Sequence, residues 1–218
     1  MEIVRIAVLV SGGGTNLQAL LDGLKASNSP GKVMVVISNR REAYGLERGR
    51  NAGVEALYIG RGNYPEAGHR GTALLEALVS RGIQWVVLAG YLDILPLELT
   101  HHYANRILNI HPSLIPAFCG MGYHGLKVHE AALERGVKVS GATVHFVNEE
   151  ADAGPILSQE TVLVLPEDTA ETLQQRVLTV EHRLLLQAVE AAAEERILWV
   201  DGRPYIKNKS HSKSSRTD

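Results

Sequence analysis

The chain has 218 residues and a mass of 23.7 kDa, with 45% hydrophobic and 21% charged residues. This length can bury a sizeable core, and the composition excludes fibrous, low-complexity and disulfide-rich small proteins. The formal net charge is −2, and four of the 22 Lys and Arg residues lie in the last twelve positions beside a single Asp. The body of the chain is therefore acidic, which argues against a general nucleic-acid partner.

Cysteine usage and the N-terminal segment indicate the compartment. The single cysteine, Cys119, cannot form an intrachain disulfide, which favours a reducing compartment. The apolar stretch 1–11 contains Glu2 and Arg5 and runs into glycines, so it has the pattern of neither a signal peptide nor a membrane span. We expect a cytoplasmic protein with no membrane partner.

Short runs rich in Val and Ile alternate with longer stretches whose apolar residues recur every three or four positions. This alternation predicts an α/β fold with a mostly parallel twisted sheet and helices on both faces. Thr169, with Thr172 in the first turn, is the expected N-cap of the last helix. In chain order, the predicted strands lie at 3–10, 33–38, 55–59, 85–89, 106–110, 139–147 and 156–164, and the predicted helices at 16–25, 43–52, 65–80, 96–103, 125–135 and 169–195.

No linker divides the chain into two folded parts. We expect one domain over 1–206 and a basic, Lys- and Ser-rich tail over 207–218 that is disordered. The turn-rich stretch 112–123 is long for a compact domain, and it begins at the carboxyl end of a predicted strand, where open α/β sheets bind ligands.

The sequence SGGGTNL at 11–17 follows the first strand and opens the first helix. Backbone amides at a helix N-terminus bind anions, and small residues let a phosphate approach closely. The dinucleotide-binding pattern is incomplete, because Leu17 takes the place of the third glycine and the second strand closes with Asn39-Arg40-Arg41 instead of an acidic residue. A phosphate of a small substrate is the favoured ligand. An NADP site using Arg40 or Arg41, and a purely structural turn, are the alternatives.

Asn109 and His111 lie at the end of the fifth predicted strand, His111 directly after residue 110, and because they are two residues apart they project from the same face. A carboxamide and an imidazole side by side can donate hydrogen bonds to one developing oxyanion, and the imidazole can move a proton. Capping of the following loop by these two side chains is the alternative.

The loop 149–155 carries three carboxylates, Glu149, Glu150 and Asp152. One of them placed against His111 would raise the imidazole pKa by favouring the charged form. A solvated acidic turn is the alternative, and the residues by themselves do not choose among the three carboxylates.

Four motifs in this order resemble the glycinamide ribonucleotide formyltransferases, folate-dependent enzymes of purine synthesis. They are GTNLQ at 14–18, LAGY at 88–91, NIHPSL at 109–114, and VHFV at 144–147 followed by DAGP at 152–155. The resemblance extends to about residue 197. It implies a Rossmann-like formyltransferase fold with antiparallel strands near the C-terminal half. The implied reaction moves a formyl group from 10-formyltetrahydrofolate, as co-substrate, to the primary amine of glycinamide ribonucleotide.

The resemblance also assigns roles to residues. It implies catalysis by Asn109, His111 and Asp152, with Asp152 keeping His111 charged. It implies small-molecule substrates and no metal, and a homodimer is a reasonable expectation. The ribonucleotide-binding residues are Gly14, Thr15, Asn16 and Glu181, and the folate-binding residues are Leu92, Asp93, Ile94, Leu95, Asn109, Asn148 and Asp152.

The chain departs from the family pattern at Asp93 and near Pro65, where relatives often carry arginine. The resemblance therefore does not assign the residues that contact the folate tail. The contacts of the loop 118–125 are not assigned. His145 is expected either to support Asn109 or to be a core histidine, and Cys119 is expected to be inert.

Two rivals share the Asn-x-His motif, methionyl-tRNA formyltransferase and formyltetrahydrofolate deformylase. They usually add a C-terminal RNA-binding domain and an N-terminal regulatory domain, respectively, and 218 residues leave room for neither. A Rossmann module that binds NADP is the rival from a different class.

Overall fold

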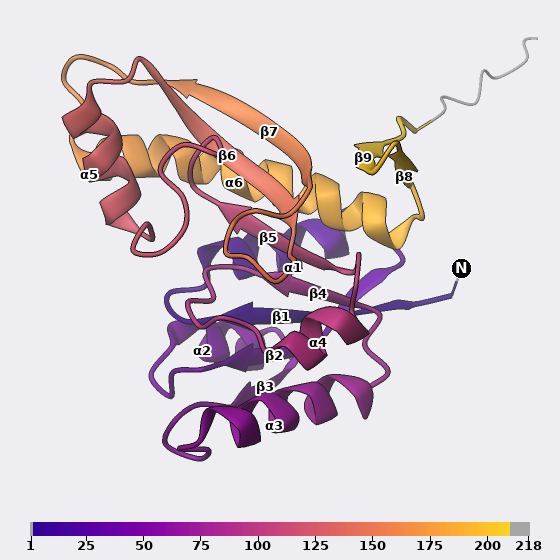
Figure 1. The fold of residues 1–218 in the computed structure, drawn as a ribbon. Coiled ribbons are helices and arrows are strands. Elements are labelled where there is room, and N and C mark those ends of the chain that lie inside the picture. The colour runs from indigo at the N-terminus through magenta and orange to yellow at the C-terminus, as the bar shows by residue number, and fades with distance from the viewer. Residues whose placement is uncertain (1, 210–218) are drawn as a thin grey trace, which may run out of the picture.

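Residues 2–209 are described by the computed structural model, in which a seven-stranded sheet forms the centre of an α/β fold (Figure 1). The strand order is β3-β2-β1-β4-β5-β6-β7. The strands are β1 (Val4–Val10), β2 (Gly31–Ser38), β3 (Glu55–Tyr58), β4 (Trp85–Leu88), β5 (Ile107–His111), β6 (Val139–Phe146) and β7 (Ile156–Leu163). The helices are α1 (Thr15–Ala26), α2 (Tyr44–Asn51), α3 (Ala67–Val79), α4 (Leu97–His102), α5 (Leu126–Arg135) and α6 (Ala170–Ala193).

The sheet is parallel from β3 to β5, and β6 and β7 run antiparallel to their neighbours. This arrangement confirms the predicted sheet, including the antiparallel strands in the C-terminal half. The chain leaves β1 for β2 on one side and later returns to β4 on the other side. The carboxyl ends of β1 and β4 therefore flank the point where the strand order reverses, which is where open α/β sheets bind ligands.

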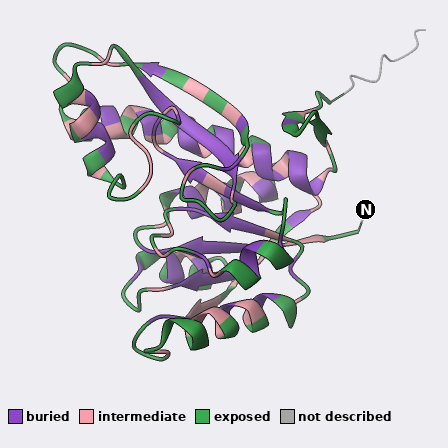
Figure 2. Cartoon of the chain, in the orientation of Figure 1, coloured by how far each residue is buried: buried purple, intermediate pink, exposed green. Residues whose placement is uncertain are grey.

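Two apolar cores hold the sheet between layers of helices. Along β1, Ile6, Val8 and Val10 pack in the core formed with α1, α2, α5 and α6, whereas Ala7 and Leu9 pack in the core under α3 and α4. Each buried side chain of the Leu or Val type contributes about 1.5–3 kcal/mol by leaving water. The central strands are buried on both faces while the outer surfaces of the helices are exposed (Figure 2).

The long helix α6 begins at the predicted N-cap. The Thr169 hydroxyl accepts from the Thr172 amide at 3.3 Å, and the Thr172 hydroxyl accepts from the Thr169 amide at 2.9 Å. These two bonds satisfy amides that the first turn of a helix leaves unpaired. The 24-residue helix then runs along the sheet beside α1, and Glu181 near its middle is hydrogen-bonded to Asn16 in the first turn of α1 (Figure 1).

A small hairpin, β8 (Ile197–Val200) and β9 (Arg203–Ile206), follows α6 and was not predicted. Its strands are short and largely exposed, so they lack the alternating burial pattern. The turn residues Asp201 and Gly202 have positive φ, and this Asp-Gly pair is a hairpin signal that the sequence did contain. Trp199 packs on Phe146, with ring centroids 4.9 Å apart.

Beyond β9, the Lys207 amide donates to the carbonyl of Arg196 at 2.8 Å. The rest of the expected disordered tail, 210–218, lies outside the described residues. Over residues 2–209, the structure contains no helix with both the length and the apolar character needed to cross a membrane.

Candidate active site

A cavity of about 700 Å³ opens at the carboxyl ends of β1, β4 and β5. The segments 12–16, 88–95, 109–112, 120–125 and 147–152 line it, together with side chains of α6. Every site residue expected from the sequence lies on its wall. These residues are Gly14, Thr15, Asn16, Leu92, Asp93, Ile94, Leu95, Asn109, His111, Asn148, Asp152 and Glu181.

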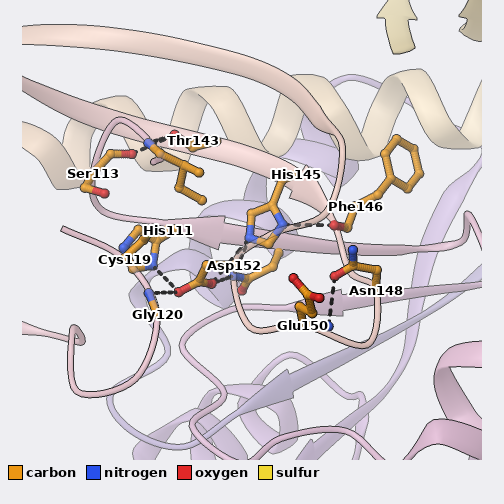
Figure 3. Close-up of polar contacts among 12 residues, drawn as sticks. His111, Ser113, Cys119, Gly120, Thr143, His145, Phe146, Asn148, Glu150 and Asp152 are labelled. Carbon is orange, nitrogen blue, oxygen red and sulfur yellow. Dashed lines mark hydrogen bonds and ion pairs between the residues drawn. The ribbon is translucent and has the colours of Figure 1, made fainter. Parts of the chain in front are cut away.

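Asp152 is the carboxylate of the acidic loop that reaches the end of β5 (Figure 3). Its Oδ2 lies 3.6 Å from Nδ1 of His111, and its Oδ1 lies 3.4 Å from Nδ2 of Asn109. The Gly120 amide donates to Oδ2 at 2.8 Å. Glu149 instead pairs with His101, at 2.7 Å, on the surface. The three groups expected to act together therefore meet at one sheet edge.

Burial and charge act in opposite directions on the pKa of Asp152. Burial favours the neutral acid, but the hydrogen bond with His145, the electrostatic interaction with the nearby His111 ring and the Gly120 amide together hold the pKa below its usual value. Asp152 is therefore ionised at neutral pH.

His111 is neutral in the free site, which corrects one expectation. Burial lowers the pKa of its imidazole, and although the Asp152 charge raises that pKa as expected, burial outweighs it. Nε2 of His111 donates to the carbonyl of Phe118 at 2.9 Å, which places the proton of the neutral ring on Nε2. Nδ1 then carries a free lone pair facing Asp152. Expecting a pKa raised overall was wrong because only 5% of His111 is exposed.

His145 orients Asn109, one of the two roles expected for it. The two residues are paired across β5 and β6, and Nε2 of His145 lies 3.0 Å from Nδ2 of Asn109. Nδ1 of His145 donates to the carbonyl of Phe146 at 2.9 Å, so its Nε2 faces the Asn109 carboxamide and Oδ1 of Asp152, which lies 3.5 Å away. The amide nitrogen of Asn109 is thereby turned toward His145 and Asp152.

Glu181 lies at the base of the cavity, on α6, and is no exposed helix charge. It is 6% exposed, and its carboxylate accepts from Nδ2 of Asn16 at 2.8 Å. Burial raises the pKa of Glu181, and the Asn16 hydrogen bond opposes this only in part. Oδ1 of Asn16 is buried without a partner among the described residues. This corner of the cavity holds polar atoms that a ligand can satisfy.

Ser11 joins the glycine loop to the loop after β4. Its amide donates to the carbonyl of Gly90 at 3.0 Å, and its hydroxyl accepts from the Leu92 amide at 2.9 Å. The same hydroxyl donates to Oδ1 of Asn39 at 2.6 Å. Ser11 was not predicted as a site residue, although it is the first residue of the SGGGTNL motif at 11–17.

The arginines considered for an NADP site lie elsewhere. The guanidinium of Arg41 stacks 4.9 Å from the ring centroid of Tyr58 and donates to Asn63 at 3.1 Å, and neither Arg40 nor Arg41 lines the cavity. Near Pro65, the guanidinium of Arg70 donates to the Pro65 carbonyl at 3.0 Å. It therefore fixes the turn at which the sequence departs from the expected family pattern.

The unassigned loop 118–125 contributes backbone groups to the site. The Phe118 carbonyl and the Gly120 amide contact His111 and Asp152. Residue type does not determine backbone contacts between distant segments, so these contacts could not be predicted from the sequence. Burial and the Asp152 charge raise the pKa of Cys119, so this thiol stays protonated at neutral pH. Within residues 2–209, no three His, Cys, Asp or Glu side chains gather as a metal site.

Comparison with known proteins identifies relatives along nearly the whole chain. The family model described as "Formyl transferase" matches residues 4–189. The chain is 44% identical to a chloroplastic phosphoribosylglycinamide formyltransferase of Arabidopsis thaliana, over 95% of this chain and 72% of that one. It is 38% identical to the Haemophilus influenzae phosphoribosylglycinamide formyltransferase, over 96% and 97%. The crystal structure of glycinamide ribonucleotide transformylase 1 from Symbiobacterium toebii superposes with a TM-score of 0.88, at 47% identity, covering 94% of this chain and 95% of that one.

Proposed function

The chain belongs to the formyl transferase family, within its phosphoribosylglycinamide formyltransferases, and from this premise we propose how its residues hold the substrates and move the formyl group. The enzyme transfers a formyl group to phosphoribosylglycinamide (glycinamide ribonucleotide) in purine biosynthesis. The donor is 10-formyltetrahydrofolate. The observation that supports the residue roles is the convergence of Asn109, His111 and Asp152 on one cavity with the glycine loop.

The ribonucleotide lies along the α1 side of the cavity. Its phosphate binds the amides of Gly14, Thr15 and Asn16 at the N-terminus of α1, where no acidic side chain opposes an anion. Its glycinamide end reaches Glu181, whose buried carboxyl and the unpaired Asn16 oxygen together offer polar contacts. This placement directs the primary amine toward the end of β5.

The folate lies along the loops after β4 and β6. Leu92 and Ile94 are 41% and 70% exposed at the cavity mouth, and they offer apolar surface to a pterin ring. Leu95, Asp93 and Asn148 complete this wall. The Leu92 amide is already bonded to Ser11, so the ring binds the other peptide groups of this loop.

The neutral amine attacks the formyl carbon, and the carbonyl oxygen becomes an oxyanion. Nδ2 of Asn109 donates to this oxyanion in place of its 3.4 Å contact with Asp152. A preorganised donor of this kind contributes about 3–4 kcal/mol to transition-state stabilisation. The amine loses its proton to Nδ1 of neutral His111, and the imidazolium formed is stabilised by Asp152, 3.6 Å away. The same Nδ1–H then protonates the folate nitrogen as its bond to the formyl carbon breaks.

Kinetics of single substitutions tests these roles. Asn109→Ala, His111→Ala and Asp152→Ala should each lower kcat at least about a hundredfold. The first removes the hydrogen-bond donor to the oxyanion, the second the group that carries the proton, and the third the carboxylate that stabilises the imidazolium. Absorbance of the deformylated folate follows the reaction, and a cuvette without ribonucleotide separates transfer from hydrolysis. His102→Ala, which replaces an exposed histidine outside the cavity, is the control. Near-normal turnover of any of the three variants would remove that residue from the mechanism.

We further propose a homodimer in the cytoplasm. Leu198, Val200 and Tyr205 of the β8–β9 hairpin are 47%, 55% and 51% exposed, and an apolar surface of this kind is suited to a second copy. The lone protonated thiol of Cys119 suits a reducing compartment. Light scattering on the purified chain measures its mass, and a monomer at micromolar concentration would reject the dimer. Immunolocalisation in the source cells tests the compartment, and a signal confined to an organelle would reject the cytoplasm.

A further inference from the structure

The glycine loop turns two consecutive carbonyls toward α2. The Gly45 amide donates to the Gly12 carbonyl at 3.0 Å, and Nε of Arg48 donates to the Gly13 carbonyl at 2.7 Å. The close approach requires glycine on both sides, because a Cβ on Gly14 would come within 2.7 Å of the Gly45 Cα. Helix α2 therefore holds the loop by one backbone bond and one side-chain bond.

Because the peptide group is planar, these contacts of the carbonyls also determine where the loop amides point. In a trans peptide the N–H points opposite to the C=O of the preceding residue. With the carbonyls of Gly12 and Gly13 directed at α2, the amides of Gly13 and Gly14 point away from α2. All three glycines line the cavity, so those amides are aimed at the ligand side.

Arg48 is itself fixed in place. Besides the Gly13 carbonyl, its guanidinium donates to Oε1 of Gln18 at 3.2 Å and stacks 5.0 Å from the ring centroid of Tyr44. The side chain is half-buried and is absent from the cavity wall. It can therefore orient the loop while making no contact with a bound substrate.

We propose that Arg48 is a positioning residue for the substrate phosphate. Its bond to the Gly13 carbonyl sets the Gly13–Gly14 peptide, and through it the amide that the phosphate meets. The inference rests on the proposed placement of the phosphate at this loop. No other part of the reaction depends on Arg48, so its removal affects binding of the phosphorylated substrate and leaves the chemical step intact.

Steady-state kinetics of Arg48→Met compares the two substrates. The KM for the ribonucleotide should rise about tenfold, with kcat and the KM for the formyl folate within twofold of the wild type. The dephosphorylated glycinamide riboside, used as a competitive inhibitor, should keep its inhibition constant. Arg41→Met is the matched control, since it removes an equal charge, a stacking contact and a hydrogen bond away from the loop. An unchanged ribonucleotide KM, an equal rise in Arg41→Met, or an equal loss for the riboside would overturn the inference.

NMR of [15N]glycine-labelled protein separates this inference from the placement of the phosphate. In the wild type, ribose 5-phosphate should shift the amide signals of Gly13 and Gly14. In Arg48→Met, a ribose 5-phosphate concentration about ten times higher should be needed for the same shift. A wild type without such shifts would contradict the phosphate placement itself. Equal shifts in both proteins would contradict only the role of Arg48.

A second variant covers the possibility that Arg48→Met does not fold. Arg48→Lys keeps the charge, but its single ammonium cannot span the Gly13 carbonyl and Gln18 in the guanidinium geometry. The ribonucleotide KM of Arg48→Lys should lie between those of the wild type and Arg48→Met. If Arg48→Met does not fold, the KM of Arg48→Lys should still exceed the wild-type value at least threefold. A wild-type KM in Arg48→Lys would then reject the proposal.

Discussion

Burial disfavours charge at three cavity residues with different results. It lowers the pKa of His111 and raises the pKa of Glu181, in both cases favouring the neutral form. At Asp152 the neighbouring donors outweigh burial, and the carboxylate stays charged. The free site thus pairs a neutral imidazole with a charged carboxylate, which is the state that the proposed transfer of a proton from the amine to His111 requires.

His129, on α5, makes the stability of the fold sensitive to acid. It is fully buried, and neither ring nitrogen has a hydrogen-bond partner in the described structure. Burial, and after it the charge of His111, lower its pKa from 6.5 to about 4. Because the unfolded chain takes up the proton first, the stability due to neutral His129 is present above pH 6.5 and is lost as pH falls toward 4.

His129→Leu should remove this pH dependence. Between pH 7 and pH 5 the wild type should lose about 2 kcal/mol more unfolding free energy than the variant does. Urea unfolding at both pH values measures the difference, and equal m-values would show that the same surface is exposed on unfolding. Parallel losses of stability in the two proteins would contradict the assignment to His129.

At the scale of elements, the contact of α2 with the end of β1 depends on glycine. A Cβ on Gly45 would lie 2.7 Å from Cγ2 of Val10, inside the packed core. Gly45→Ala should therefore cost about 1–3 kcal/mol of stability by overpacking and, by moving α2 off the loop, weaken ribonucleotide binding.

Urea unfolding and the ribonucleotide KM measure the two effects of Gly45→Ala. Gly68→Ala is the control, because a Cβ there meets nothing within 4 Å and alanine favours a helix interior by up to about 1 kcal/mol. Wild-type stability in Gly45→Ala would show that the helix can shift without cost.

Most elements could be predicted because their apolar residues repeat with a clear period. The predicted boundaries of α6 agree with the structure within two residues, since Thr169 and the apolar stripe define the helix. The hairpin β8–β9 was missed because its side chains are mostly exposed and carry no period. The contacts of loop 118–125 could not be predicted, because they are made by backbone atoms whose partners lie far along the chain.

At the scale of the molecule, the cavity joins the first and last parts of the chain. Asn16 and Glu181 meet across a separation of 165 residues, and the β6–β7 loop completes the opposite wall. The motif residues could be located from the sequence and its family resemblance. The direction of the His111 pKa shift could not be predicted from the sequence, because it depends on how deeply the ring is buried in the folded chain.

Ligands should therefore stabilise the whole fold. At a hundred times its Kd, the ribonucleotide or tetrahydrofolate should each add about 2.7 kcal/mol to the unfolding free energy, and a chain of this size should gain about 5–10 °C in Tm. Differential scanning calorimetry measures both shifts. A Tm unchanged by a ligand that saturates the enzyme in kinetics would mean that the ligand binds the unfolded chain equally well.

The hydrogen bonds of Ser11 help to set the distance between the loop after β1 and the loop after β4. Its amide and hydroxyl tether the loop after β4 to the loop after β1, and β1 and β4 are adjacent parallel strands. Neighbouring strands lie about 4.8 Å apart as a matter of backbone hydrogen bonding. The two loops proposed to hold the ribonucleotide and the folate are thus kept at a separation set by main-chain geometry, which side-chain substitutions elsewhere in the protein leave unchanged.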